Sequence, residues 1–355
     1  MNLIEDKIDI KSMFLEEIET DFLKYGFPRY KAKQVFKWLS KGASSFDEMS
    51  DLSIEHRKSL SDIYYISNIS IEKKSISKID GTIKYLFKLD DGEFIESVLM
   101  KYKHGYSICL STQVGCRMGC KFCATGKSGF SRNLKASEIL SQIILAQIDN
   151  NIRISNIVLM GMGEPLDNYD NVIRFLKLVS CEHGINIGLR HISLSTCGIV
   201  DRIYDLAKEK LPITFSVSLH APNDNLRSIT MPINNKWGID DLIKACKDYI
   251  KETNRRISFE YAMIKGINDT DECARELSKR LYGMLCHVNL ILVNEVHGNK
   301  YKKSGKERVE NFVRILSQRG LNVTVRRKLG ADIEASCGQL KRSYLKKEGN
   351  TYENI

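Results

Sequence analysis

The stretch on which the interpretation of this chain depends is Gly-Cys-Arg-Met-Gly-Cys-Lys-Phe-Cys, residues 115–123. It holds Cys116, Cys120 and Cys123, separated by gaps of three and two residues. Thiolate sulfur is the usual protein ligand of iron–sulfur clusters, and four ligands complete a cubane 4Fe–4S core. Since only three cysteines lie in this loop, a small molecule can bind the fourth iron, as substrates do at open metal sites. The spacing therefore predicts a 4Fe–4S cluster with one iron that the protein does not hold.

Two other uses of these cysteines are open. Buried thiols pack as small hydrophobic residues, and thiolates also bind zinc. Zinc normally takes four nitrogen or sulfur ligands, and no second Cys or His pair stands nearby at zinc-finger spacing. The pattern therefore favours the cluster over both alternatives.

Composition is that of a globular chain. Of 355 residues, 43% are hydrophobic and 28% charged, which allows one large α/β domain and a smaller appendage. No run of about 18 apolar residues is present, so we expect no membrane span. The N-terminus alternates charges and lacks the apolar stretch of a signal peptide. We expect a cytoplasmic monomer whose ten cysteines are thiols, ligands or catalysts rather than structural disulfides.

Basic residues gather in two segments. Lys300–Lys347 holds 14 Lys and Arg against four acidic residues, which equals the whole net charge of +10. Lys24–Lys41 holds six basic residues, no acid and five interleaved aromatics. Basic side chains release counterions from phosphates, and aromatic rings stack on unpaired bases. Together the segments favour a nucleic-acid partner; the alternative is a solvated face over core aromatics.

Apolar spacing divides the chain into parts. We expect an N-terminal helical domain over residues 1–67, a small antiparallel β extension or linker over 68–104, a core over 105–345 and a tail over 346–355. The helices predicted in the first part are Ile10–Lys24, Tyr30–Leu39 and Ile54–Tyr64.

The core alternates strands with helices. Six such units predict parallel strands and an α/β fold, a TIM-like or partial (β/α)6 barrel, with a doubly wound open sheet as the alternative. The predicted strands are Ser107–Ser111, Ile157–Met160, Ile192–Ser195, Ile213–Leu219, Ser258–Met263 and Val288–Leu292. The predicted helices are Ser137–Asp149, Tyr169–Cys181, Ile239–Lys251, Asp271–Tyr282 and Lys306–Arg319.

Polar motifs follow several of these strands, where barrel enzymes place their chemistry. Gly161-Met-Gly-Glu-Pro165 offers close backbone approach at Gly163 and a carboxylate, Glu164, that can accept a hydrogen bond from an ammonium group. Alone, each motif is equally a turn or a cap, and their shared position favours a ligand site. The other candidates for this site are Ser195, Ser218, Leu219, His220 and Asn294.

Two further cysteines are candidates for chemistry. Cys337 lies in a glycine-flanked loop not far from Arg326-Arg327-Lys328, and nearby cations would favour its thiolate. Cys109 lies on the first predicted core strand. The alternatives are a surface thiol for Cys337 and a core residue for Cys109.

Taken in this order, the motifs resemble the RlmN/Cfr family of RNA adenine methyltransferases, which are radical S-adenosylmethionine (SAM) enzymes. The resemblance covers nearly the whole chain, including Pro28-Arg29-Tyr30 and Gln34–Leu39 in the helical domain. It implies a radical SAM barrel, an N-terminal RNA-binding domain, and SAM bound to the fourth iron of the cluster. It also implies two SAM molecules per turnover, one as methyl donor and one as radical source.

The resemblance assigns roles residue by residue. The cysteine matching Cys337 carries the methyl group and forms a covalent intermediate with RNA. The cysteine matching Cys109 resolves that intermediate and ends as a disulfide with Cys337. The glutamate matching Glu96 is the proton acceptor.

Pro165 distinguishes the two branches of the family. RlmN-like members have Pro at this position, whereas Cfr-type enzymes usually have Ala. The RlmN branch implies methylation of adenosine C2 in 23S rRNA and tRNA, with electrons from a flavodoxin or ferredoxin. The alternative is a Cfr-type C8 methyltransferase. Leu292–Val296 departs from the usual Pro-x-Asn-Pro-Phe, although Asn294 is kept.

A different class of protein, an RNA-binding iron–sulfur or zinc protein without methyl transfer, would explain the charge and the cysteine loop. It gives no role to Cys337, Glu96 or the SAM-like loops. The sequence therefore favours the methyltransferase.

The cysteine loop yields a direct test. Anaerobically reconstituted protein should be brown and hold about four irons per chain, as a cubane cluster does. Changing Cys116, Cys120 or Cys123 to Ala should remove iron and SAM cleavage together. A colourless protein with one zinc would contradict the cluster.

Overall fold

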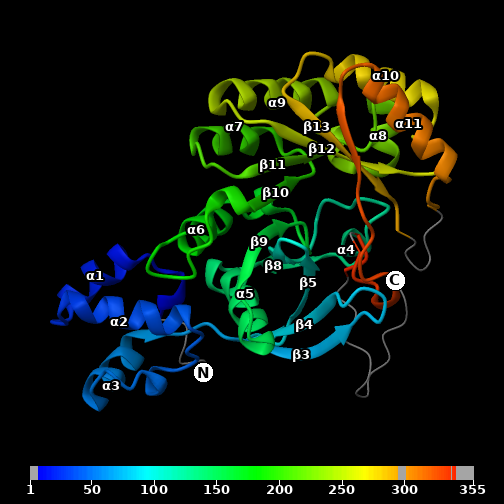
Figure 1. Ribbon diagram of the computed structural model, residues 1–355. Coiled ribbons are helices and arrows are strands. Elements are labelled where there is room, and N and C mark those ends of the chain that lie inside the picture. Colours follow the sequence, from blue (N-terminus) through cyan, green and yellow to red (C-terminus); the bar gives the residue numbers. More distant parts are fainter. Residues whose placement is uncertain (1–6, 295–300, 337, 341–355) are drawn as a thin grey trace.

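One continuous mixed sheet forms the centre of the computed structural model, which describes residues 7–294, 301–336 and 338–340 (Figure 1). Within these residues the sheet has ten strands. In spatial order they are β14 (Asn322–Val325), β13 (Cys286–Leu292), β12 (Ile257–Met263), β11 (Thr214–Ser218), β10 (Ile192–Thr196), β9 (Ile154–Leu159), β6 (Gly105–Cys109), β5 (Phe94–Tyr102), β4 (Ile83–Leu89) and β3 (Ile69–Ile76).

The strands from β14 to β6 pair parallel to one another. This confirms the predicted α/β fold with an open, partial barrel. β14 is a further parallel strand that the sequence analysis did not predict, since it is only four residues long and half polar. The helices between the strands are α5 (Ala136–Asn150), α6 (Tyr169–Val179), α7 (Val200–Lys208), α8 (Asp224–Thr230), α9 (Ile239–Thr253), α10 (Asp271–Leu281) and α11 (Lys306–Gln318).

Helix α9 shows why these segments fold as they do. Its buried residues recur at three- and four-residue spacing, from Ile239 through Leu242 and Cys246 to Tyr249, so one face packs on the sheet. The helix ends at Thr253, and the next residue, Asn254, adopts the left-handed conformation with φ of 52° that Asn tolerates better than most residues. The apolar spacing and the left-handed residue therefore agree on where this helix ends.

The predicted antiparallel β extension continues the main sheet. β3, β4 and β5 pair antiparallel, and β5 pairs antiparallel with β6, so that Val98 lies opposite Cys109. The turns contain Gly81 and Gly92, both with positive φ, as tight hairpin turns require. This pairing places Glu96, on β5, beside the first strand of the barrel.

The N-terminal part is helical, as predicted. It contains α1 (Leu15–Lys24), α2 (Arg29–Ser40) and α3 (Ile54–Ile63), with a short pair of strands, β1 (Ile8–Asp9) and β2 (Tyr64–Tyr65). Of these helices, α2 lies beside α5 and α6, and α3 lies farther from them (Figure 1). The Ser137 backbone N–H donates to Ser12 Oγ at 3.1 Å, and Arg174 pairs with Glu17 at 2.6 Å. The domain boundaries given above remain a prediction.

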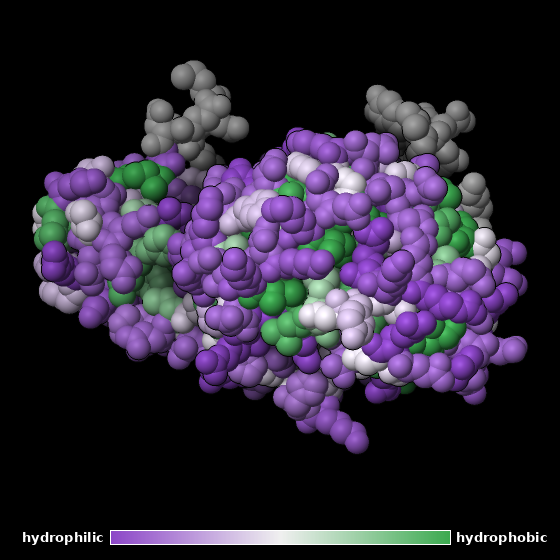
Figure 2. Space-filling model, turned by 90° about the horizontal axis from the view of Figure 1, so that it is seen from above, coloured by the Kyte–Doolittle hydropathy of each residue, from purple (hydrophilic) through white to green (hydrophobic). Residues whose placement is uncertain are grey.

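The surface is mostly hydrophilic on the face seen in Figure 2, with separate hydrophobic patches. Isolated apolar side chains are ordinary on protein surfaces. Among the described residues, no helix is both long and apolar enough to cross a membrane.

The core under β11 should dominate stability. Phe215 is fully buried, and its ring centroid lies 4.6 Å from that of Tyr249 on α9. Phe215→Ala should lower the free energy of unfolding by about 3–5 kcal/mol, because it leaves a cavity between strand and helix. Tyr282→Ala, at a site 77% exposed, should change it by less than about 0.5 kcal/mol. Urea unfolding measures both, and similar effects would contradict this core.

Candidate active site

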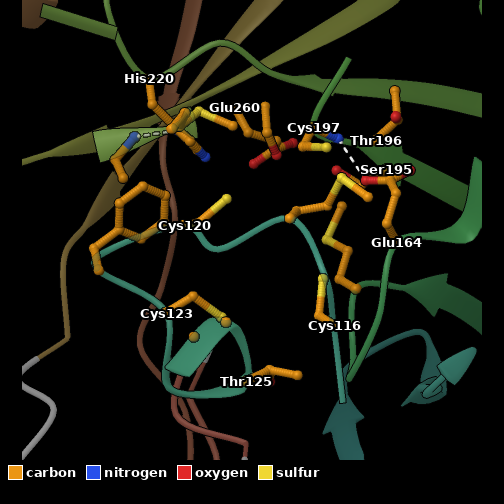
Figure 3. Close-up of a pocket in the computed structure, with 18 of the residues that line it drawn as sticks. Cys116, Cys120, Cys123, Thr125, Glu164, Ser195, Thr196, Cys197, His220 and Glu260 are labelled. Atoms are coloured by element: carbon orange, nitrogen blue, oxygen red, sulfur yellow. Dashed lines mark hydrogen bonds between the residues drawn. The ribbon is translucent and has the colours of Figure 1, made fainter. Parts of the chain in front are cut away.

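A cavity of about 160 Å³ lies where the cysteine loop meets the carboxyl ends of the parallel strands. Figure 3 shows the three loop cysteines on one side, facing His220, Glu260, Cys197 and Glu164 on the other. Residues predicted from the sequence line much of this cavity. Those residues are Cys116, Cys120, Cys123, Gly163, Glu164, Ser195, Ser218, His220 and Asn294.

Short contacts fix the cysteine loop between β7 (Gln113–Gly115) and α4 (Ala124–Lys127). Gly115 has φ of 79°, and a Cβ there would lie 1.9 Å from the carbonyl oxygen of Gly129, so only glycine fits. The Cys116 N–H donates to the same carbonyl at 2.8 Å. The Lys121 N–H donates to the Thr230 carbonyl at 2.9 Å, which ties the loop to the end of α8.

The donor set suits an iron–sulfur cluster. Burial raises the pKa of the Cys116 thiol to about 12 and also raises that of Cys120, so the thiolates need a cationic partner to form. In the described part of the chain, no three His, Cys, Asp or Glu side chains are arranged around a single metal ion. A cubane cluster takes its thiolates on separate irons, so it does not require such convergence.

Glu164 joins two strand-end loops. One carboxylate oxygen accepts from the Cys197 N–H at 2.7 Å, and the other from the Leu166 N–H at 3.0 Å. Burial raises the pKa of this carboxyl. Each carboxylate oxygen has a second lone pair, so the group can still accept a hydrogen bond from an ammonium group in the cavity. The preceding Gly163, with φ of 101°, allows the turn.

The strand ends of β10 and β11 supply hydroxyl groups. Ser195 and Ser218 are half-buried and line the cavity. Leu219 differs, because it is fully buried and does not line the cavity. Its backbone N–H donates to the Glu260 carbonyl at 3.1 Å.

His220 faces the cavity as a neutral imidazole. It has φ of 57°, and its Nδ1 accepts from the Ala262 N–H at 2.9 Å, which leaves the proton on Nε2. Burial, with a smaller contribution from the positive charge of Arg227, lowers the pKa of His220 to about 3. Its ring packs edge-on against Phe122, with centroids 5.0 Å apart.

A second cavity, of about 190 Å³, adjoins the first. Cys109 lines it, at the end of β6, and Asn294 and Arg326 line both cavities. Glu96 is buried on the neighbouring strand, where its carboxylate pairs with Lys84 at 3.2 Å and its carbonyl accepts from Ser111 Oγ.

Cys337 lies outside the described residues. Ser336, on one side of it, lines the second cavity, and Gly338, on the other side, lines the first. The described residues on either side of Cys337 therefore line two adjoining cavities.

Two site residues were missed by the sequence analysis. Glu260 is buried in the first cavity, where it accepts from Asn289 Nδ2 at 2.8 Å. A lone acid within the apolar strand Ile257–Met263 was a signal that could have identified it. Arg227, fully buried behind the cavity, had no comparable signal, because its partners are backbone carbonyls from distant loops.

Comparisons with known proteins agree with this geometry. The family model "Radical SAM superfamily" matches residues 110–277, and "Ribosomal RNA large subunit methyltransferase N-terminal domain" matches residues 8–66. A crystal structure of a radical SAM methyltransferase from Sphaerobacter thermophilus covers 95% of this chain and 100% of its own, at 41% identity and a TM-score of 0.90. The fold and site are those of a radical SAM enzyme.

Curated relatives define the family more closely. The probable dual-specificity RNA methyltransferase RlmN of Alkaliphilus metalliredigens (strain QYMF) is 54% identical, over 96% of this chain and 97% of its own length. The protein of the same description from Clostridium novyi (strain NT) is 51% identical, over 95% and 99%. The chain belongs to the RlmN family, as the sequence motifs indicated.

The low pKa of His220 gives a pH-dependent prediction. Since the unfolded chain binds a proton near pH 6.5 and the folded chain only near pH 3, wild type should lose stability as the pH falls through this window. Asn accepts the left-handed backbone, so His220→Asn should fold without this dependence. Between about pH 7.5 and about pH 5.5, the advantage of wild type should shrink by about 1.4 kcal/mol in urea unfolding. An unchanged difference would mean that His220 is not buried as a neutral group.

Proposed function

We propose that this protein is a dual-specificity RNA methyltransferase that adds a methyl group to C2 of adenosine in 23S rRNA and in tRNA, 3′ of the anticodon. The observation that carries the proposal is the junction of two cavities. One is lined by the cysteine loop and the strand-end polar groups; the other is lined by Cys109 and by Ser336, the residue before Cys337 in the sequence. The RlmN relatives favour C2 over C8 as the position.

The carbon to be methylated explains why two cavities are needed. An adenine C2 is an sp2 carbon without a usable lone pair, so it cannot attack the methyl group of a sulfonium directly. A thiol can accept that methyl group and then deliver its carbon. When bound, the cluster and SAM supply both the methyl group and the one-electron chemistry that activates it. We infer two SAM molecules per turnover, used in succession at one site.

The residues of the first cavity would bind and orient SAM and the cluster. Glu164 offers a fixed carboxylate to the SAM ammonium group, and Gly163 lets the backbone approach it. His220 presents an Nε2–H donor that stays neutral. Cys116, Cys120 and Cys123 would hold the cluster. Ser195, Ser218 and Asn294 would complete the SAM site, and Leu219, which does not line the cavity, would only position its neighbours Ser218 and His220.

We place the side chains that react with the RNA at or near the second cavity. We assign Cys337 as the methyl carrier that becomes covalently joined to RNA, Cys109 as the thiol that resolves this intermediate, and Glu96 as the proton acceptor. The ion pair with Lys84 supports Glu96 as a carboxylate in a buried place. Cys109 lines this cavity, whereas Glu96 does not; it lies on β5 two residues before Val98, which pairs with Cys109 and also lines the cavity.

Basic residues at the second cavity suit an RNA partner. Lys303, Arg326, Arg327 and Lys328 line it, so phosphates beside a target adenosine would meet positive charge there.

The N-terminal cluster Lys24–Lys41 divides between core and surface. Phe27 and Phe36 are buried, which agrees with the alternative that these aromatics belong to the core. Tyr25 and Tyr30, in contrast, are 49% and 61% exposed. The exposed rings can stack on unpaired bases. We propose that this domain helps to bind RNA.

We further propose that the protein is a cytoplasmic monomer. A low-potential flavodoxin or ferredoxin would supply its electrons.

Nucleoside analysis tests the product. RNA from cells that lack the gene should contain no 2-methyladenosine at these positions, and the purified enzyme with SAM and a reductant should restore it. Retention time separates 2-methyladenosine from 8-methyladenosine, which has the same mass. 8-Methyladenosine as the main product would contradict the proposal.

A matched pair of cysteine variants tests the carrier. Cys337→Ala should abolish methyl transfer, whereas Cys181→Ala, a half-buried cysteine that lines neither cavity, should keep it. Peptide mass spectrometry should find a methyl group on Cys337 in active enzyme. Full activity of Cys337→Ala would refute the carrier role.

A further inference from the structure

Arg227, on α8, is fully buried, and its guanidinium contacts only neutral acceptors. Its Nε donates to the Leu219 carbonyl at 3.1 Å, and one Nη donates to the carbonyls of Cys197 and Ser218 at 2.6 and 3.2 Å. The other Nη donates to Asn234 Oδ1 at 3.0 Å. Among the ion pairs of the described residues, none involves Arg227. The charge of Asp224 acts on the guanidinium from a distance, but its carboxylate accepts from Asn234 and the Ile239 N–H instead, so within the described residues no carboxylate pairs directly with Arg227.

This charge lies directly behind the cysteine loop. The loop rests on the same segment as Arg227: the Lys121 N–H bonds the Thr230 carbonyl, and a Cβ at Gly119 would lie 3.7 Å from Pro232. Cys197 and Ser218, whose carbonyls bind the guanidinium, line the same cavity as the three loop cysteines.

A buried cation needs compensation. Carbonyl dipoles offset part of the desolvation cost of a guanidinium, but an isolated charge in a protein interior remains expensive. A 4Fe–4S core with three thiolates is an anion, and one-electron reduction adds another negative charge to it. Net charge near a cluster is one of the factors that set its reduction potential.

We propose that Arg227 is the buried counter-charge of the cluster, a positioning residue that raises its reduction potential. This inference rests on the cluster proposed at Cys116, Cys120 and Cys123. The cluster gains one electron from an external low-potential reductant, and no bond to Arg227 forms or breaks. Because the guanidinium favours the more negative, reduced state, it makes that electron easier to accept.

The test uses reconstituted holoenzyme and separates the effect of the charge at residue 227 from the effect of the hydrogen bonds that Arg227 makes. Arg227→Lys keeps the charge and loses most of the carbonyl contacts, whereas Arg227→Met removes the charge. A redox titration with dithionite, followed by the electron paramagnetic resonance signal of the reduced cluster, gives the potential of each variant. The Met variant should shift to a more negative potential, and the Lys variant should stay near wild type.

Asn234→Ala is the matched control, because it removes one anchor of the guanidinium and leaves its charge in place. Its potential should match wild type. Equal potentials for wild type and the Met variant at full iron content, or equal shifts for Met and Lys, would show that Arg227 only holds the loops together.

Iron content separates failure of this inference from failure of the cluster itself. Wild type without iron after reconstitution would refute the cluster and with it the role of Arg227, whereas an unshifted potential at full iron content would refute only the role of Arg227. If the Met variant does not retain iron, Arg227→Gln, which keeps two N–H donors, serves as the neutral variant. Loss of iron from both neutral variants but not from Lys would support the counter-charge, whereas loss from Lys too would overturn it.

Discussion

Buried hydrogen bonds at the carboxyl ends of the parallel strands are the constraint on which the site depends. Glu164 connects the loop after β9 to the loop after β10. Arg227 connects the loop after β10 to the loop after β11. A buried polar group that loses its partner is costly, so these loops cannot move independently. The cavity is therefore shaped by the backbone, and its side chains are held in position before any ligand enters.

Much of this arrangement could be predicted from the sequence, because it follows from local order. Alternating strands and helices imply parallel strands, and parallel strands bring their carboxyl ends to one edge. Glu164, Ser195, Ser218 and His220 were therefore expected together, and they line one cavity. The cluster site was predicted from the spacing of the loop cysteines alone, without any tertiary information.

What the sequence could not provide depends on contacts between distant segments. Arg227 is held by the carbonyls of residues 197, 218 and 219, and no sequence pattern in α8 predicts these contacts. Strand β14 is too short and too polar to stand out, and the main sheet recruits it by pairing with β13. The interleaved aromatics of Lys24–Lys41 alternate between core and surface, which composition alone cannot resolve.

The sheet has two free ends. Within the described residues β14 and β3 stand at opposite edges and do not pair with each other, so the barrel stays open along one side. A closed barrel would admit only what fits through its mouth. An open one lets a single nucleotide of a long polymer come in sideways, while the rest of the strand stays outside. An RNA substrate therefore does not have to present an end to reach the strand ends of this sheet.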